Sequence, residues 1–377
     1  MLSFSAFLQE KLRLAPERAP GRQWNLGPMR TVMERTGLGR VKLASQIVSI
    51  VGSNGKGSCG YLLASSLQNS GKRVAFVSSP HVLNYRERLR INGLMLSEAL
   101  WDACYQKVST LLSQLSYYES IMFISFLLVQ EHNIDVLVLE AGLGGRYDAI
   151  NVLDADVLMV STIDLEHMDY LGDTREKIFF EKIQVARSNT QVFANIDEIS
   201  WVEKARQDIG FIHQPLQMIN VPLIKGVSPA LLSLVANVLQ RFFAIDDFSL
   251  MPTSIPYRSQ IIAPGPVVID TAHNVPAACN LMKQLVQDLG HEKWDVYCNQ
   301  KTDRDLVLFL QALMPWVKAG HICTAPGLHP RQQLPIHLAD WQWLEASKLN
   351  APFPNRPAVV FGSFYLLQYL TEHLALS

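Results

Sequence analysis

Cysteine is scarce in this sequence of 377 residues. Only five are present, and no two of them form a C-x-x-C pair. An odd, scattered set does not suggest a disulfide framework or a cysteine-rich metal site, so we expect reduced and mostly buried thiols. The five are Cys59, Cys104, Cys279, Cys298 and Cys323. Reduced thiols are typical of cytoplasmic proteins.

An excess of one charge and long apolar runs are also missing. The formal net charge is -1, so charge favours neither a nucleic acid nor an acidic membrane as partner. The longest apolar stretch, 121–129, is far too short to cross a bilayer. The first residues lack the basic head and apolar run of a signal peptide. We therefore expect a cytoplasmic protein, take a monomer as the default, and expect no membrane or nucleic-acid partner.

What the sequence does contain is an alternation of short apolar runs with amphipathic segments. Runs that are rich in Val and Ile and apolar throughout predict buried parallel strands, and the segments between them predict helices. The predicted strands are 46–51, 73–78, 135–139 and 157–162, and the predicted helices are 58–69 and 119–132. This order predicts an α/β fold of the doubly wound type.

The length suits two domains. Residues 188–255 are less regular. Four prolines punctuate the later part, which we interpret as the end of the first domain and a linker: Pro222, Pro229, Pro252 and Pro256. A second alternation follows, with strands at 266–270, 294–298 and 358–361 and helices at 276–289, 303–314 and 363–373. We therefore predict a first domain at 1–255 and a smaller second domain at 256–377.

The segment 51–58, V-G-S-N-G-K-G-S, follows a predicted strand and opens a predicted helix. Its glycines let the backbone turn so that N–H groups face phosphate oxygens, and the helix N-terminus adds a partial positive charge. Lys56 can neutralise phosphate and Ser58 can hold Mg²⁺. The strict G-x-x-x-x-G-K-[ST] pattern is not met, because Ile50 stands where its first glycine would be. A purely structural glycine turn is the alternative.

Other polar residues also follow predicted strands. Glu140 ends one, and a carboxylate at that edge suits Mg²⁺, although a helix cap or an ion pair is the alternative. His167 lies beyond another, where it is either a metal ligand or a satisfied loop residue. Asp270, His273 and Asn274 end or follow a third, where they can touch a nucleotide or form an ordinary Asx turn.

Together these motifs resemble those of the folylpolyglutamate synthases and dihydrofolate synthases, a branch of the Mur ligase superfamily. The family's G-T-N-G-K-G-[ST] loop corresponds to 52–58, its S-S-P-H-L loop to 78–90, and its E-V-G-L-G-G-R-x-D-A-T-N segment to 140–151. Its L-D-H-T segment corresponds to 165–185, its D-x-A-H-N-P to 270–275, and a late G-S motif to 362–366. Six motifs in the same order over nearly the whole chain make the resemblance specific.

The resemblance implies an N-terminal P-loop-type doubly wound ATPase domain and a smaller C-terminal Rossmann-like α/β domain. It implies a ligase that uses ATP and two Mg²⁺ ions. Such a ligase activates the carboxylate of dihydropteroate, of a reduced folate or of both as an acyl phosphate, and couples it to L-glutamate. The alternatives are a Mur-type ligase for another acid, a simple nucleotide hydrolase, and a non-catalytic nucleotide-binding homologue.

The resemblance also implies roles for the matching residues. The nucleotide would be held by Gly52, Asn54, Gly55, Lys56, Gly57, Ser58, Arg258, Asp270 and His273. The metal would be held by Ser58, Ser79, Glu140, His167 and Lys182. The acid substrate would contact Ser79, Pro80, His81, Arg88, Asp148 and Ala149. Lys56, His167 and Lys182 would act in catalysis. Lys182 matches a lysine that is carbamylated in the family, and the alternative is a plain surface lysine.

The chain departs from the family's pattern at several positions. The substituted residues are Ile150 for Thr, Glu166 for Asp, Ile183-Gln184 for Ala-Gly, Tyr257 for Gly and Val275 for Pro. Pro229 falls where the family carries an Asn that contacts adenine. We expect these changes to leave the phosphate and metal chemistry intact and to affect the acceptor and the nucleotide affinity.

Overall fold

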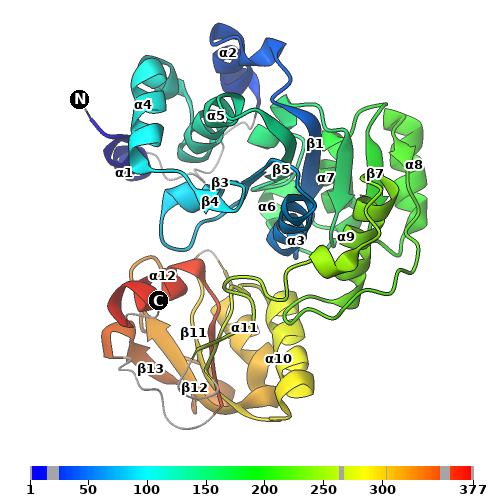
Figure 1. Cartoon of the computed structure of the whole chain (residues 1–377). Coiled ribbons are helices and arrows are strands. Elements are labelled where there is room, and N and C mark those ends of the chain that lie inside the picture. The colour runs from blue at the N-terminus through cyan, green and yellow to red at the C-terminus, as the bar shows by residue number, and fades with distance from the viewer. Residues whose placement is uncertain (1, 15–24, 263–266, 303, 349–356, 375–377) are drawn as a thin grey trace. The chain divides into compact units, whose positions relative to one another are not determined.

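The structure is a computed structural model that describes residues 2–14, 25–262, 267–302, 304–348 and 357–374. The described chain divides into two compact units, whose elements are labelled in Figure 1. Unit 1 contains the residues up to Pro80 together with Tyr85–Leu223 and Val227–Pro252. Unit 2 contains His81–Asn84, Ile224–Gly226 and the residues from Thr253 onward. Each unit is built around a sheet of its own.

Among the described residues, unit 1 has an eight-stranded sheet in the order β4-β3-β2-β5-β1-β6-β7-β8. The strands from β2 to β8 in this order are parallel, whereas β3 and β4 are antiparallel to their neighbours. Their bounds are β1 Ala44–Val51, β2 Val74–Val77, β3 Leu89–Ile91, β4 Leu94–Met95, β5 Ile134–Glu140, β6 Val157–Val160, β7 Gln191–Ala194 and β8 Ile212–His213. The central strands are apolar on both faces, as a parallel sheet covered on both sides requires.

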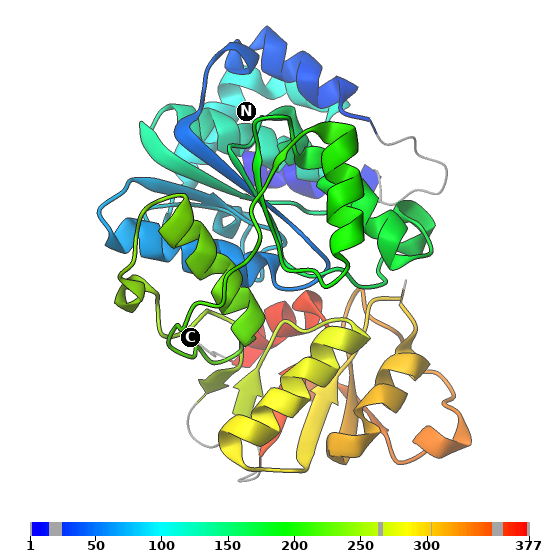
Figure 2. The same cartoon turned by 90° about the vertical axis from the view of Figure 1, so that its right-hand side faces the viewer.

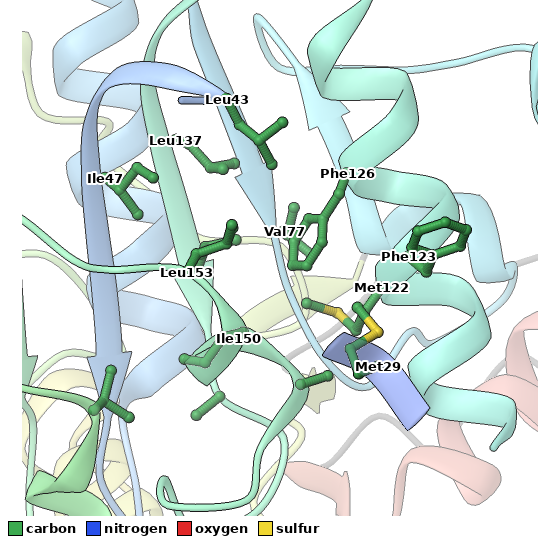
Figure 3. Packing of buried hydrophobic residues seen from close by; sticks show 14 of the residues in the cluster. Met29, Leu43, Ile47, Val77, Met122, Phe123, Phe126, Leu137, Ile150 and Leu153 are labelled. Atoms are coloured by element: carbon green, nitrogen blue, oxygen red, sulfur yellow. The ribbon is translucent and has the colours of Figure 1, made fainter. Parts of the chain in front are cut away.

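Helices cover both faces of this sheet (Figure 1). Their bounds are α1 Phe4–Leu14, α2 Gly27–Arg35, α3 Lys56–Asn69, α4 Glu98–Val108, α5 Tyr117–Gln130, α6 Met168–Leu171, α7 Arg175–Lys182, α8 Ile199–Ile209 and α9 Pro229–Arg241. Phe76 of β2 lies against Gly60 of α3. The next residue, Val77, lies on the α5 side, beside Phe126 (Figure 3). Adjacent residues of one strand therefore serve the two faces.

The core on the α5 side joins α5 and α2 to the sheet. Figure 3 shows Met122 of α5 beside Met29 of α2, and Phe126 of α5 beside Val77 of β2. The helix begins with a capping box, in which the Ser116 hydroxyl accepts from the backbone N of Glu119 and the Glu119 carboxylate accepts from the backbone N of Ser116. The predicted strands and helices of this region are confirmed as β1, α3, β2, α5, β5 and β6.

Residues 188–255 are more regular than expected, and the interpretation of their later part as a linker is wrong where α9 lies, although unit 1 does end in that part, at Pro252. This segment contains β7, α8, β8 and α9, which extend the sheet of unit 1 and cover it. Helix α9 packs against α3, as Figure 2 shows. Pro229 occupies the first turn of α9, after the Ser228 cap, where a proline costs no hydrogen bond. A proline that starts a helix was therefore taken for a linker residue.

In its described residues, unit 2 has a six-stranded sheet in the order β13-β12-β11-β14-β10-β9, in which only β9 is antiparallel to its neighbour. Its elements are β9 Gln260–Ile262, β10 Val267–Ile269, α10 Val275–Leu289, β11 Trp294–Cys298, α11 Leu306–Leu313, β12 Val317–Thr324, β13 Gln342–Glu345, β14 Ala358–Phe361 and α12 Phe364–Leu374. One apolar cluster lies beneath α10 and α11, and a second beneath α12. The six predicted elements are confirmed. Two predicted end residues, Pro266 and Asp303, lie outside the described residues.

Two composition-based expectations can be compared with the structure. All five cysteines are free thiols, and four of them are buried. In the described part of the chain, no helix has both the length and the apolar character needed to cross a membrane.

Candidate active site

The loop between β1 and α3 has a backbone shape that only glycine accommodates. Gly52 has a φ of 145° and Gly55 a φ of 83°, both in the left-handed region. A Cβ atom on Gly52 would lie 2.0 Å from Ser161 Oγ, and one on Gly55 would lie 2.4 Å from Leu231 Cδ1. Ser161, just after β6, and Leu231, near the start of α9, therefore leave no room for a side chain at these two loop positions.

Hydrogen bonds from the segment after β6 hold this loop further. Ser53 N donates to Thr162 O over 2.7 Å, and Asn54 N donates to Thr162 Oγ1 over 3.0 Å. Asp164 N donates to Ser53 Oγ over 3.0 Å. Ser161 Oγ donates to Asn54 O over 2.7 Å. Sequence motifs did not reveal Ser161 or Thr162 as part of the site, because they act through short-range contacts made only in the fold.

The start of α3 presents the groups that a phosphate needs. The first N–H groups of a helix have no partner within it, and they point toward the loop that precedes the helix. Ser58 lies in this first turn and is 4% exposed. Lys56 Nζ donates to Gly52 O over 2.8 Å, which keeps its ammonium beside the loop. The Lys56 charge, the first backbone amides of α3 and the Ser58 hydroxyl therefore all lie at the start of this helix.

Glu140 lies at the carboxyl end of β5, against the same helix start. Its Oε2 accepts from Ser79 N over 3.0 Å, and its two oxygens lie 3.3 Å and 3.4 Å from the position of a Cβ on Gly57. Any side chain at position 57 would press on this carboxylate. The fold thus brings Glu140, Ser79 and the turn that carries Ser58 together, as predicted. The neighbouring thiol of Cys59 has a pKa raised to about 12 by burial and by the charge of Glu140, so it is no nucleophile at neutral pH.

Lys182, at the end of α7, is not a surface lysine. It is 2% exposed, its Nζ lies 2.7 Å from Glu166 Oε1, and it donates to Gly52 O over 2.9 Å. Burial raises the pKa of Glu166, but the charges of Lys182 and Lys56 outweigh burial and lower that pKa to about 2. The alternative of a plain surface lysine is therefore wrong. Glu166, noted only as a departure from the family, is the charge that faces Lys182.

His167 follows Glu166 and caps α6 with a φ of 44°, in the left-handed region. A non-glycine residue held there costs about 1–2 kcal/mol. Such positions are enriched at functional sites. Hydrogen bonds join Thr162 and Asp164, a few residues earlier, to the phosphate loop, and a metal-binding role for His167 stays a prediction.

The donors near the loop suit a hard cation that shares its ligands with a phosphate. Among the described residues, no group of three or more His, Cys, Asp or Glu side chains could hold a metal ion alone. Mg²⁺ commonly uses one or two carboxylates, hydroxyls, water and substrate phosphate oxygens instead. Glu140 and Ser58 supply that kind of set. The donor chemistry therefore fits Mg²⁺ bound together with a nucleotide.

Asp148 holds the loop that follows β5. One of its oxygens accepts from the backbone N of Gly142 and Leu143, over 2.8 Å and 2.9 Å. The other accepts from Ile150 N over 3.1 Å and from the Tyr118 hydroxyl over 3.0 Å. Asp148 is 5% exposed, and burial raises its pKa. These contacts shape the loop, and a direct contact of Asp148 with an acid substrate stays a prediction.

Two aromatic residues that the motifs did not reveal lie beside this loop. The Arg88 guanidinium carbon lies 5.6 Å from the ring centre of Tyr117 and 5.9 Å from that of Tyr118, both at the start of α5. Arg88 is 7% exposed, and Ala149, at the start of a short 3-10 turn after Asp148, is 2% exposed. Arg88 is thus part of a packed cation–aromatic cluster. Of the other predicted substrate contacts, Pro80 belongs to unit 1 and His81 to unit 2.

The remaining predicted residues lie in unit 2. Asp270 follows β10, and its Oδ1 lies 3.6 Å from Arg258 Nη1. His273 Nδ1 lies 2.9 Å from Thr271 O, and its ring lies 5.5 Å from that of Phe364. The following Asn274 caps α10 by accepting from Ala277 N, which is the structural alternative that its sequence position allowed. The structure brings Arg258 and Asp270 into direct contact.

A hollow of about 520 Å³ opens beside α6 and α7, but none of the predicted site residues lines it. Its charged side chains are engaged with one another, since Arg146 Nε lies 3.2 Å from Glu181 Oε2 and Lys204 Nζ lies 3.7 Å from Glu176 Oε1.

Comparison with known proteins links this arrangement to one group of enzymes. Residues 50–209 match the Mur ligase middle domain. A dihydrofolate synthase/folylpolyglutamate synthase of Escherichia coli (strain K12) is 32% identical over 390 residues, which cover 92% of this chain and 91% of that protein. The residues matched by the family model span the phosphate loop, Glu140 and Lys182.

Two solved structures extend the likeness to the whole fold. E. coli FolC in complex with DHPP and ADP has a TM-score of 0.85 at 25% identity, over 98% of this chain and 97% of that one. A bifunctional folylpolyglutamate synthase/dihydrofolate synthase with Mn, AMPPNP and L-glutamate bound has a TM-score of 0.84 at 25% identity, over 99% and 98%. Both units of the chain are therefore covered by proteins of one kind.

Proposed function

Because the chain belongs to the dihydrofolate synthase/folylpolyglutamate synthase family, we propose that it joins L-glutamate to a pterin-containing acid at the expense of ATP. The acid is dihydropteroate, a reduced folate or both. The observation that carries this proposal is the contact of the phosphate loop with Glu140, which brings phosphate-binding amides, Lys56 and a metal-binding carboxylate together. The relatives that bind ADP, DHPP, AMPPNP, Mn and L-glutamate support the same substrates.

The reaction proceeds in two transfers and needs no nucleophile from the protein. An oxygen of the substrate carboxylate attacks the γ-phosphorus of ATP, and ADP leaves with the electron pair of the broken bond. The amine of glutamate then attacks the acyl carbon, loses a proton, and displaces phosphate. Lys56 and the first amides of α3 offset the charge that builds up on the transferred phosphoryl group. A bound divalent ion would add Lewis-acid stabilisation of the same oxygens.

Two Mg²⁺ ions complete the proposal. Ser58, Glu140 and His167 would hold one of them, with Ser79 beside Glu140. Lys182, as a carbamate, would supply an oxygen ligand to the second. Carbamylation changes the charge at Lys182 from +1 to -1, so its contact with Glu166 could persist only with a cation between the two groups. The buried position of Lys182 beside Gly52 O supports a role at this site.

The acid substrate would contact the segment from Ser79 to His81 and the cluster around Arg88, Asp148 and Ala149. Aromatic rings beside a cation, as at Arg88 and Tyr118, suit a flat heterocycle. We also propose domains at 1–255 and 256–377, each with its own sheet, and a cytoplasmic location, which the five free thiols support.

One assay tests the function directly. ADP release is measured with dihydropteroate or tetrahydrofolate, each with and without L-glutamate. We expect sustained ADP release only when an acid and glutamate are both present, together with a product heavier by one glutamyl unit. ADP release without either substrate would indicate a hydrolase, and release with a different acid only would indicate another amide ligase.

A further inference from the structure

Helix α1 is a part of unit 1 to which neither the motifs nor the proposed reaction assigns a role. It lies against α4 and α5, and Figure 1 shows it beside α4. Its first residue, Phe4, is fully buried, and Phe4 N donates to Asp102 Oδ1 of α4 over 2.7 Å. In its last turn, Lys11 Nζ donates to Ser113 O over 2.8 Å and to Leu115 O over 2.6 Å. The helix is therefore fixed at both ends, on two different parts of the unit.

The contact at the start of α1 fixes the side chain of Tyr85. The Phe4 ring is stacked on that of Trp101, with ring centres 5.8 Å apart. The Tyr85 ring meets both edge-on, at 5.5 Å from Phe4 and 5.3 Å from Trp101. The Tyr85 hydroxyl is buried and has no hydrogen-bond partner among the described residues. The position of this side chain therefore depends on ring packing.

Tyr85 and Arg88 are the two ends of one 3-10 turn, Tyr85–Arg88. In a 3-10 helix, side chains three residues apart lie on the same side. A displacement of the Tyr85 ring would therefore carry the Arg88 side chain with it.

The contact at the end of α1 fixes the other side of Arg88. The two carbonyls that accept from Lys11 lie directly before the Ser116 cap of α5, and Tyr117 and Tyr118 are the first helical residues after that cap. The Arg88 guanidinium carbon lies 5.6 Å and 5.9 Å from the centres of these two rings. Helix α1 thus joins the turn that carries Arg88 to the helix start that carries the rings around it.

We propose that α1 is a positioning element for the acid substrate, in which Phe4 and Lys11 set how Arg88 lies against the rings of Tyr117 and Tyr118. This inference rests on the proposed function, because it takes the cluster around Arg88 as a contact of the pterin-containing acid. Phe4 is 0% exposed and acts through its neighbours, and Lys11 acts through backbone carbonyls. A binding site loses affinity when the shell that supports its contacting residues is loosened.

The test measures the KM for the acid in Phe4→Leu and Lys11→Gln, as full chains, with whichever of dihydropteroate and tetrahydrofolate the unmutated protein accepts. We expect each variant to raise this KM about fivefold or more and to leave the KM for ATP unchanged. Lys11→Arg should restore most of the acid affinity, since a guanidinium can donate to both carbonyls. A purely structural role would lower the amount of active protein, and thus the apparent kcat, without changing the KM for the acid.

Val202→Ala, in the core beneath α8, is the control for lost packing, and it should lower the melting temperature while both KM values stay unchanged. In an Arg88→Gln background, Phe4→Leu should raise the KM for the acid no further, because its effect passes through Arg88.

An unchanged KM for the acid in Phe4→Leu and Lys11→Gln overturns the inference. So does a KM for ATP that rises as much as that for the acid, because α1 would then support the whole unit and not the acid site. If Phe4→Leu does not fold, Lys11→Gln, whose side chain is only partly buried, decides alone. An unmutated chain that joins neither acid to glutamate would instead overturn the proposed function, and this inference with it.

Discussion

Two ammonium groups share one acceptor at the candidate active site. Lys56 Nζ and Lys182 Nζ lie 2.8 Å and 2.9 Å from Gly52 O. Lys56 is partly exposed and donates its hydrogen bonds to loop carbonyls, whereas Lys182 is buried and faces Glu166. Lys56 can therefore turn toward a phosphate. Sequence motifs predicted both lysines, but they could not reveal the Glu166 contact, which depends on how α7 packs beside the loop.

Lys56→Ala should lower kcat/KM for ATP by about 100-fold or more, because one preorganised charge at the transferred phosphoryl group is lost. The melting temperature should change little, since the Lys56 side chain has no core contact. Steady-state kinetics and thermal unfolding measure the two effects. Lys72→Ala, beyond the other end of α3, should retain full activity. Near-normal turnover of Lys56→Ala would refute the phosphate-loop assignment.

Lys182→Ala should lose most activity, and short-chain carboxylates such as acetate should partly restore it in the presence of Mg²⁺ by filling the vacated oxygen site. Relative to the unmodified protein, in which Lys182 is an ammonium, the variant also leaves Glu166 buried without its partner, which costs about 3–5 kcal/mol for such pairs. Adding Glu166→Gln should recover part of that stability. Activity at several acetate concentrations and chemical unfolding measure both effects.

Lys177→Ala is the matched control for this experiment, because Lys177 lies on the same helix, is exposed, and pairs with the exposed Asp173. It should retain activity and stability. Full activity of Lys182→Ala, or an intact protein mass that lacks the added CO₂, would contradict the carbamate proposal.

At the scale of elements, the sequence predicted what periodicity and strand composition determine. The apolar runs of β1, β5 and β6 were recognised because both of their faces are buried. Helix α9 was missed because Pro229 was taken as a break, although the following residues are almost all buried. The short strands β8 and β9 carry too few residues for an alternation to show, and they are recognised only by their pairing with β7 and β10.

Because α9 forms one wall of the phosphate loop, Gly55→Ala should disturb both. The new methyl group would meet Leu231 Cδ1, and a φ of 83° strains any residue with a Cβ by about 1–2 kcal/mol. We expect lower stability and weaker ADP binding. In the background of Leu231→Ala, the same change should cost only the backbone strain, since the methyl group then has room.

Chemical unfolding of the four proteins in this cycle measures the interaction. Gly71→Ala is a useful comparison, because Gly71 has a φ of 89° but nothing within 4 Å of its Cβ position. It should show the backbone cost alone. If Gly55→Ala lowered the free energy of unfolding equally with Leu231 and with Ala at position 231, α9 would not shape the loop.

At the scale of the molecule, two α/β units could be predicted, but the membership of each unit could not. His81–Asn84 and Ile224–Gly226 lie within the sequence range of the first domain and yet belong to unit 2. Val82 is 5% exposed and lies in the same apolar cluster as Val267 and Val360. The composition of the sequence does not reveal that such a short segment belongs to the other unit, because one buried valine, Val82, is enough to join it to the apolar cluster.

The last prediction concerns the response of the whole chain to its nucleotide. A ligand that binds only the folded state stabilises it by about 2.7 kcal/mol at 100 times its Kd. For a chain of 377 residues this raises the melting temperature by about 3 °C.

MgADP should therefore raise the unfolding midpoint of the full chain. Removal of the divalent ion with EDTA should lower that gain, because Ser58 and Glu140 offer oxygen ligands that a metal would join to the phosphates. Lys56→Ala should show a smaller shift at the same ADP concentration, whereas Lys107→Ala, whose ammonium pairs with Glu131 on the surface, should show the full shift. Scanning calorimetry at several ADP concentrations measures these differences. An equal shift for Lys56→Ala and the unmutated chain would place the nucleotide away from the loop between β1 and α3.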